Sequence, residues 1–390
     1  MLRSTTTLLV CLSAAAALPA WGQSYLVAPF ANRTGATNLD WVGESVSEAI
    51  RETLADGGFS VLTREEREES ARKLSIQAVS QVSLASLAKL SEAAGADRLL
   101  YGRIELIPAP AGTAEGASRG TLRITARVLD IREVVQIGEF FETGPAEMLA
   151  ALETDFAWKV LRWARPNQAD SLEEFRRRHP AVKLNARESY IRGLMTSAPD
   201  QRHRLLTQAV RLDAQFPQPA FFLGRGHFEN GNYREASGWL DRVPPSNLYY
   251  IEARFLLGLC RHHLSDFAGA RQLLEQLAPR LAAPEVSNNL GAALARLNQP
   301  EALDHFRKAL AADPNDPDYL FNVGYALWKR AEFTEAANYF RGVLGRARDH
   351  QDAIQLLGRC LKQSGPRKGD WRSDGLERLK ESYEEPPARP

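Results

Sequence analysis

The second half of the chain repeats one apolar pattern at a nearly constant spacing. Six glycines, most of them preceded by leucine or valine, are separated by 31, 34, 33, 33 and 34 residues: Gly193, Gly224, Gly258, Gly291, Gly324 and Gly358. About twelve residues after four of them comes an alanine, followed four residues later by leucine or phenylalanine, as in Ala236 with Leu240 and Ala302 with Phe306. A period of this length predicts stacked pairs of helices.

A glycine inside a helix destabilises it by roughly 1 kcal/mol, so six glycines in register predict close contact between the paired helices. The pattern resembles the tetratricopeptide repeat over residues 186–363. That resemblance implies an all-helical solenoid that binds other proteins. In the first unit, Pro199 predicts that the first helix ends early. The last helix, residues 352–362, is expected to cap the apolar end of the array.

Residues 24–165 follow a different pattern, in which short apolar or alternating runs are separated by amphipathic stretches. These runs predict strands at residues 25–30, 59–62, 99–107, 121–130 and 134–142, and helices at residues 41–54, 63–75, 83–94 and 148–163. The order predicts a compact α/β domain with a mixed sheet. The predicted fold class is therefore α+β, with an amino-terminal mixed-sheet α/β domain followed by an all-α solenoid.

Three segments of this domain resemble the amino-terminal domain of TolB-type periplasmic proteins and their relatives among curli-secretion and flagellar outer-membrane proteins. The segments are residues 27–44, beginning Val27-Ala28-Pro29-Phe30, residues 95–102, beginning Gly95-Ala96-Asp97, and residues 124–130, beginning Ile124-Thr125-Ala126. The resemblance implies a role in envelope assembly or partner recruitment. It carries over no catalytic residue.

The beginning of the chain has the pattern of a secretory signal peptide. Met1-Leu2-Arg3 supplies the positive charge, residues 8–18 the apolar stretch, and Ala20-Trp21-Gly22 a cleavage site before Gln23. The sequence thus predicts an exported, periplasmic protein with a signal peptide at residues 1–22. Two alternatives stay open, a retained anchor and lipidation at Cys11. Cleavage leaves Cys260 and Cys360, which lie three repeats apart, too far for a disulfide.

The expected organisation is therefore a signal peptide at 1–22, an α/β domain at 24–165, a helical linker at 166–185, repeats with a capping helix at 186–363, and a mostly disordered tail at 364–390. Within that tail, residues 376–383 could form one short helix. The formal net charge is +1, from 49 basic and 48 acidic side chains. This balance does not favour nucleic acid as a partner.

The sequence contains no motif for a catalytic site or a cofactor, so no catalytic residue, cofactor or metal is predicted. Adjacent His262 and His263 could ligate a metal only with difficulty, because neighbouring helix residues point about 100° apart. Gly224-Arg225-Gly226 does not follow a strand, which argues against a dinucleotide site.

The best functional candidates lie on the first helix of each repeat, which lines the concave face in the family that the sequence resembles. Positions three before, one after and four after the glycines give a predicted partner-binding set: Phe221, Arg225, Phe228, Phe255, Leu259, His262, Asn288, Phe321, Tyr325 and Trp328. Aromatic and arginine side chains on a groove suggest an amphipathic ligand. The alternative is that this aromatic stripe is core.

The favoured hypothesis is a non-enzymatic exported scaffold that holds a segment of another protein in the groove of its repeats, with envelope or outer-membrane association. One alternative is a periplasmic sensor that binds a small molecule or cell-wall fragment through the α/β domain. The other is an enzyme without a recognisable motif. The sequence predicts neither the partner nor the oligomeric state.

Overall fold

The computed structural model describes residues 23–76, 79–107, 120–167, 170–367 and 373–383. The predicted signal peptide at residues 1–22, with Cys11, lies outside these residues. Within them, none of the helices combines the length and the apolar character needed to cross a membrane.

The amino-terminal domain is built on a mixed sheet, as the sequence predicts. Its strands are β1 (Ser24–Val27), β2 (Ala31–Asn32), β3 (Ser60–Val61), β4 (Arg98–Ile107), β5 (Thr121–Asp130) and β6 (Val135–Pro145). They are ordered β3-β1-β4-β5-β6, and β2 pairs with β4. Strand β1 runs parallel to β3 and β4, whereas β4, β5 and β6 form an antiparallel meander.

Helices cover both faces of this sheet. They are α1 (Asp40–Asp56), α2 (Arg64–Lys73), α3 (Leu84–Ala93) and α4 (Leu149–Ala164), with short 3-10 turns at Thr37–Leu39, Val79–Gln81 and Ala146–Met148. Side chains on a strand alternate between its faces. Tyr25 and Val27 accordingly join the core beneath α1 and α4, while Leu26 and Ala28 join the core beneath α2 and α3.

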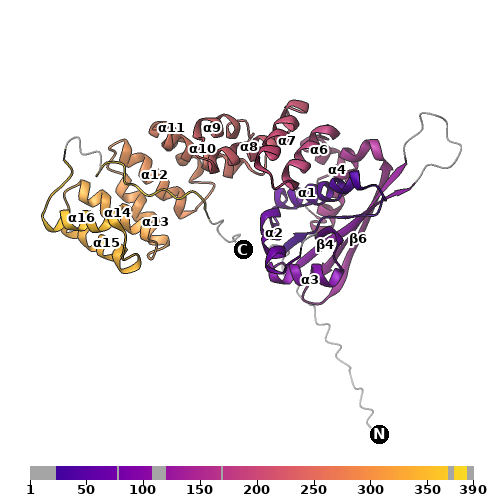
Figure 1. The fold of residues 1–390 in the computed structure, drawn as a ribbon, viewed down its shortest axis with the longest axis horizontal. Coiled ribbons are helices and arrows are strands. Elements are labelled where there is room, and N and C mark those ends of the chain that lie inside the picture. Colours follow the sequence, from indigo (N-terminus) through magenta and orange to yellow (C-terminus); the bar gives the residue numbers. More distant parts are fainter. Residues whose placement is uncertain (1–22, 77–78, 108–119, 168–169, 368–372, 384–390) are drawn as a thin grey trace, which may run out of the picture.

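The rest of the described chain is a curved array of helix pairs that extends away from the sheet (Figure 1). After α5 (Leu172–Arg178), the helices are α6 (Leu184–Met195), α7 (Pro199–Leu212), α8 (Gln218–Glu229), α9 (Tyr233–Leu240), α10 (Tyr250–His263), α11 (Phe267–Leu277), α12 (Pro284–Arg296), α13 (Ala302–Ala312), α14 (Pro317–Lys329), α15 (Phe333–Arg346) and α16 (Gln351–Leu361). The array confirms the predicted all-helical solenoid. The first helix of the first pair ends at Met195, and Pro199 opens the next helix, where its missing N–H costs nothing.

The signature glycines allow the two helices of a pair to touch. A Cβ at Gly291 would lie 2.8 Å from the Phe306 ring, and a Cβ at Gly224 would lie 2.6 Å from Leu240 Cγ. Gly358 differs, because nothing lies within 4 Å of the equivalent point. The prediction of close packing is therefore wrong for this last glycine. Its helix, α16, packs on α14 and α15, and no second helix of its own pair follows it among the described residues.

The α/β domain is docked on the first repeat through a shared core. Val46 and Ile50 of α1 belong to the same buried cluster as Tyr190 of α6, Leu206 of α7 and Leu223 of α8. Arg187 of α6 is buried in this junction, where its Nε donates to Ser45 Oγ at 3.0 Å. The packing is therefore continuous from the sheet into the first repeat.

The two kinds of glycine predict opposite effects for the same substitution. Gly291→Ala should destabilise the protein by about 1–2 kcal/mol, because the gain in helix propensity is smaller than the cost of displacing the Phe306 ring. Gly358→Ala adds a methyl group in open space and should stabilise the protein by up to about 1 kcal/mol. Urea denaturation of the two variants measures both. Equal effects would contradict the assignment of Gly291 to a helix contact.

Candidate peptide-binding groove

The concave face of the repeats is occupied by the chain's own carboxyl-terminal segment, residues 373–383, which we call the tail segment. Figure 1 shows it in yellow, returning from the α16 end along α14 and α12. Residues 376–383 contain no helix. The expectation of a short helix there is therefore wrong, and this segment instead packs against the core of the repeats. The disorder expected for the rest of the tail concerns residues that lie in part outside the described ranges, at 368–372 and 384–390.

Three buried asparagines hold the backbone of the tail segment. Asn322 of α14 accepts from the Arg378 N–H at 2.7 Å and donates to the Arg378 carbonyl at 2.8 Å. Asn289 of α12 makes the same pair of bonds with Lys380, at 2.9 and 2.8 Å. Asn288 adds a third donor, 2.8 Å from the Arg378 carbonyl. Each asparagine is completely buried, so these amides have no water to bond with.

The two basic side chains of the tail segment lie against acidic and aromatic groups. Arg378 pairs with Asp352 of α16, and its guanidinium lies 4.8 Å from the centre of the Phe321 ring. Lys380 Nζ lies 2.6 Å from an oxygen of Asp318 and 2.8 Å from one of Asp316. Both basic side chains therefore combine an ion pair with a cation–π contact, which Arg378 makes with Phe321 and Lys380 makes with Tyr319. In the cation–π contact of Lys380, Nζ lies 5.1 Å from the centre of the Tyr319 ring.

Apolar contacts also extend along the tail segment, since Leu376, Leu379 and Tyr383 pack on the repeat core. The Tyr383 ring meets Phe255 of α10 edge to face at 5.0 Å. The groove thus contacts the segment from α10 to α16, and the segment runs opposite to the order of the repeats.

Glu377 is poorly accommodated in the groove. Its side chain is 1% exposed, and its nearest cation is Lys329 Nζ, 4.0 Å away. Among the described residues, no other residue donates a hydrogen bond to either carboxylate oxygen. Burial accordingly raises the pKa of Glu377. A buried carboxylate that receives no hydrogen bond from another residue is unfavourable, so the tail segment fits the groove with one poorly placed group.

Half of the predicted partner-binding residues contact the carboxyl-terminal part of the chain. Phe255, Asn288 and Phe321 do so as described above. Tyr325 donates its hydroxyl to the Ser373 carbonyl at 2.8 Å, and Trp328 Nε1 donates to the Ser364 carbonyl at 2.8 Å. The aromatic rings are not exposed, as an open groove would require, but buried. Phe255, Phe321 and Tyr325 therefore form the floor beneath the tail segment, whereas Trp328 lies against the chain at Ser364.

The other predicted residues serve packing or the surface. Phe221, Phe228 and Leu259 are buried in the repeat core. Arg225 forms an exposed ion pair with Glu229 at 3.1 Å. His262 packs edge to face on Phe267, and burial lowers its pKa to about 4. Over the described part of the chain, no group of three His, Cys, Asp or Glu side chains is placed to hold a metal.

Sequence reasoning missed the residues that grip the backbone and the charges, namely Asn289, Asn322, Asp316, Asp318 and Asp352. One signal was available. Asn289 and Asn322 both lie two residues before a signature glycine, in helices whose other residues near that point are mostly apolar. Asparagine is a weak helix former, so its recurrence at one position of successive repeats points to a required polar contact. The aspartates lie near helix starts, where capping is the ordinary explanation.

Comparison with known proteins agrees with this architecture. Residues 291–353 match the tetratricopeptide repeat family model. Human cell division cycle protein 16 homolog is 26% identical over 170 residues, which is 43% of this chain and 23% of that protein. This chain thus matches less than a quarter of its curated relative. The family match is confined to residues 291–353, which extend from α12 to the start of α16 in the helical array.

Two solved structures are similar to part of this chain. MamA from Desulfovibrio magneticus RS-1 is 22% identical, covers 44% of this chain and 99% of its own, and has a TM-score of 0.40. YrrB, described as a tetratricopeptide protein with an unusual peptide-binding site, is 20% identical, covers 44% of this chain and 87% of its own, and has a TM-score of 0.36.

The asparagine contacts predict how the tail segment responds to their removal. Replacing both Asn289 and Asn322 by alanine removes four backbone hydrogen bonds and should release the segment. Trypsin cleavage after Arg378 and Lys380 should then accelerate on the order of tenfold or more. Asn338→Ala, on the exposed side of α15, is the matched control and should leave cleavage unchanged. If the double variant is cleaved at the original rate, the asparagines do not hold the segment.

Proposed function

We propose that this chain is an exported adaptor that binds an extended segment of another protein in the concave groove of its repeats. One observation carries the proposal, namely that buried asparagines of two successive repeats bond the N–H and carbonyl groups of Arg378 and Lys380. These bonds are made to backbone groups that every extended peptide possesses. The groove can therefore accept a segment from another protein in the same manner.

The side-chain contacts of the tail segment suggest the chemistry of that partner. A basic residue is favoured where Arg378 meets Asp352, and a second one two residues later, where Lys380 meets Asp316 and Asp318. Apolar residues are favoured at the places of Leu376 and Leu379, and an aromatic residue at the place of Tyr383. The partner is thus an extended basic segment with interspersed apolar side chains.

On this proposal the tail segment is an internal competitor. Because it belongs to the same chain, its effective concentration at the groove is high, on the order of millimolar for a short connection. A partner must therefore bind better than the tail segment or arrive with a second contact. The buried Glu377 lowers the affinity of the tail segment, which leaves it displaceable by a partner with an uncharged residue at that place.

The export of the chain and its association with the envelope remain part of the proposal. They rest on the signal-peptide pattern at residues 1–22 and on the resemblance of residues 24–165 to TolB-type domains. The docking of the α/β domain on the first repeat supports a single adaptor unit, in which the domain positions the groove. The sensor alternative is favoured by one observation, a pocket at that junction, which is considered below.

Charge reversal in the tail segment tests the proposal in the full-length protein. Arg378→Glu with Lys380→Glu places carboxylates against Asp316, Asp318 and Asp352 and should empty the groove. A fluorescent peptide of residues 373–383 should then bind to this variant at least about tenfold more tightly than to the unaltered chain. A scrambled peptide and a Glu381→Ala protein, altered at an exposed position, are the controls. Absence of peptide binding to a folded variant would refute the groove assignment.

The misplaced carboxylate predicts a pH effect on the same binding. The docked pKa of Glu377 is raised above that of the free peptide, so docking is favoured below the free pKa and weakens as pH rises through the docked one. Replacing Glu377 by Gln in the peptide should strengthen binding by about tenfold at neutral pH and remove this dependence. Fluorescence anisotropy at several pH values measures both. Equal affinity of the two peptides at every pH would contradict the account of Glu377.

A further inference from the structure

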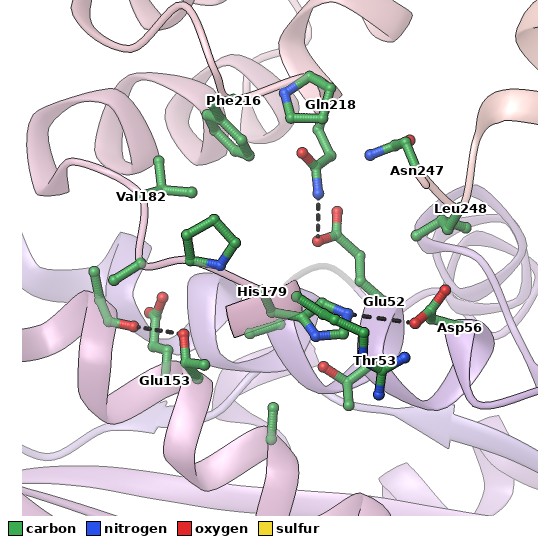
Figure 2. A pocket seen from close by; sticks show the side chains of 18 of the residues that line it. Glu52, Thr53, Asp56, Glu153, His179, Val182, Phe216, Gln218, Asn247 and Leu248 are labelled. Atoms are coloured by element: carbon green, nitrogen blue, oxygen red, sulfur yellow. Dashed lines mark hydrogen bonds and ion pairs between the residues drawn. The ribbon is translucent and has the colours of Figure 1, made fainter. Parts of the chain in front are cut away.

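A pocket of about 320 Å³ lies where the α/β domain meets the repeats. Its walls come from α1, α4, the segment 179–182, the start of α8 and the loop 244–248. Figure 2 shows Glu52 reaching across it to Gln218, with Glu153, Val182 and Phe216 also on its walls. Its volume falls at the lower end of the range for sites that take small organic molecules.

Among the buried charged groups that α1, α4 and α6 place beside this pocket, carboxyl groups outnumber guanidinium groups. Two guanidinium groups, Arg51 and Arg187, face three carboxyl groups, Glu48, Glu52 and Glu153. Arg51 is committed to Glu48, at 2.6 Å. Arg187 forms longer ion pairs with both other carboxyl groups, with Nε 3.5 Å from Glu153 Oε2 and Nη1 3.9 Å from Glu52 Oε2.

The pKa values of Glu52 and Glu153, the two carboxyl groups of this set that line the pocket, reflect the small number of cations near them. Burial, together with the charge of Glu48, raises the pKa of Glu52 to about 7, and burial raises the pKa of Glu153. The Glu153 side chain is 4% exposed, and its Oε1 has no hydrogen-bond partner among the described residues. Gln218 Oε1, on α8, is likewise buried and has no hydrogen-bond partner among the described residues. The buried polar groups around the pocket therefore include two acceptors whose hydrogen-bonding capacity is unmet.

We propose that this pocket binds a small organic cation, with its ammonium group between Glu52 and Glu153 and an apolar body beside Phe216. An ammonium group supplies the missing positive charge and up to three N–H donors. Val182, Leu248 and Pro217 extend the apolar wall. An anion would add to the excess negative charge. A bare metal ion is not favoured, because the described residues offer no cluster of three ligands for it.

The position of the pocket connects it to both parts of the molecule. Glu52 belongs to α1 of the α/β domain, and its Oε2 accepts from Gln218 Nε2 of α8 at 3.1 Å. Tyr190 of α6 donates its hydroxyl to Glu52 Oε1 at 3.4 Å. A bound cation therefore contacts groups on both sides of the junction and stabilises their docking.

Binding of phenethylamine to the full-length protein tests the proposal. Phenethyl alcohol, which is neutral and nearly the same shape, is the matched control ligand. The amine should raise the thermal unfolding temperature, because it binds the native state alone, whereas the alcohol should not. Glu52→Gln and Glu153→Gln should each weaken amine binding by about tenfold, as measured by calorimetry. Glu335→Gln, on the exposed face of α15, should have no effect.

The proposal also predicts a proton signature. The titratable and charged groups around Glu52 are Glu48 and Arg51 on α1, Glu153 on α4, Arg187 and Tyr190 on α6, and Tyr249. His179 and Asp56, which pair with each other at 3.3 Å, line the same pocket. The ammonium group binds the ionised form of Glu52, whose pKa is raised to about 7. The affinity for phenethylamine should therefore rise from pH 6 to pH 8, and binding should release a proton. Proton release is measured as a binding enthalpy that depends on the buffer. In Glu52→Gln this dependence should vanish.

Three results would overturn the assignment of the pocket. They are equal shifts with amine and alcohol, absence of any binding, and amine binding that is unchanged in both glutamine variants. The glutamine variants are expected to fold, because each replaces an incompletely paired buried carboxyl group with a neutral amide of the same size. Circular dichroism at the start of each titration verifies this.

Discussion

The hydrogen-bonding needs of three buried side-chain amides determine which kind of chain can occupy the concave face of this protein. Asn288, Asn289 and Asn322 are completely buried on helices whose own backbone groups are already bonded within the helix. A buried polar group left without a partner costs roughly 1–3 kcal/mol. The helices cannot satisfy these amides by themselves, although Asn322 donates to Asn288 at 2.7 Å. An extended backbone can satisfy them, because alternate residues of an extended chain present N–H and carbonyl groups on the same edge. The groove is therefore suited to an extended backbone, which the tail segment supplies in this structure.

Much of the architecture follows from the sequence, because it depends on repeated local patterns. The glycine period predicts helix pairs, and the contact of Gly291 with Phe306 shows the physical cause of that period. Alternating apolar residues likewise predict the antiparallel strands β4 and β5, whose two faces both need cover. These inferences succeed because each unit needs only its neighbours along the chain.

The occupied groove was not predictable in the same way. Leu376, Leu379 and Tyr383 have spacing close to that of one helix face, and nearby charges favour an exposed helix or disorder. Their actual conformation is set by Asn289 and Asn322, about 91 and 56 residues earlier in the chain. No local pattern contains that information. The predicted set used the positions three before, one after and four after each signature glycine, and these include the aromatic floor. It left out the position two before the glycine, where Asn289 and Asn322 lie.

The junction pocket depends on the same physical principle, applied to charge rather than to hydrogen bonds. In the groove, buried amides require a backbone, and beside α1 a buried excess of carboxyl groups requires a cation. The two sites differ in how far the protein's own groups supply the hydrogen bonds or the positive charge that each site requires. The tail segment satisfies the amides almost completely and leaves one carboxylate, Glu377, misplaced. At the junction, Arg187 is shared between Glu52 and Glu153 and satisfies neither fully. The groove is thus a site that the protein fills for itself, whereas the pocket depends on a proton or a ligand from outside.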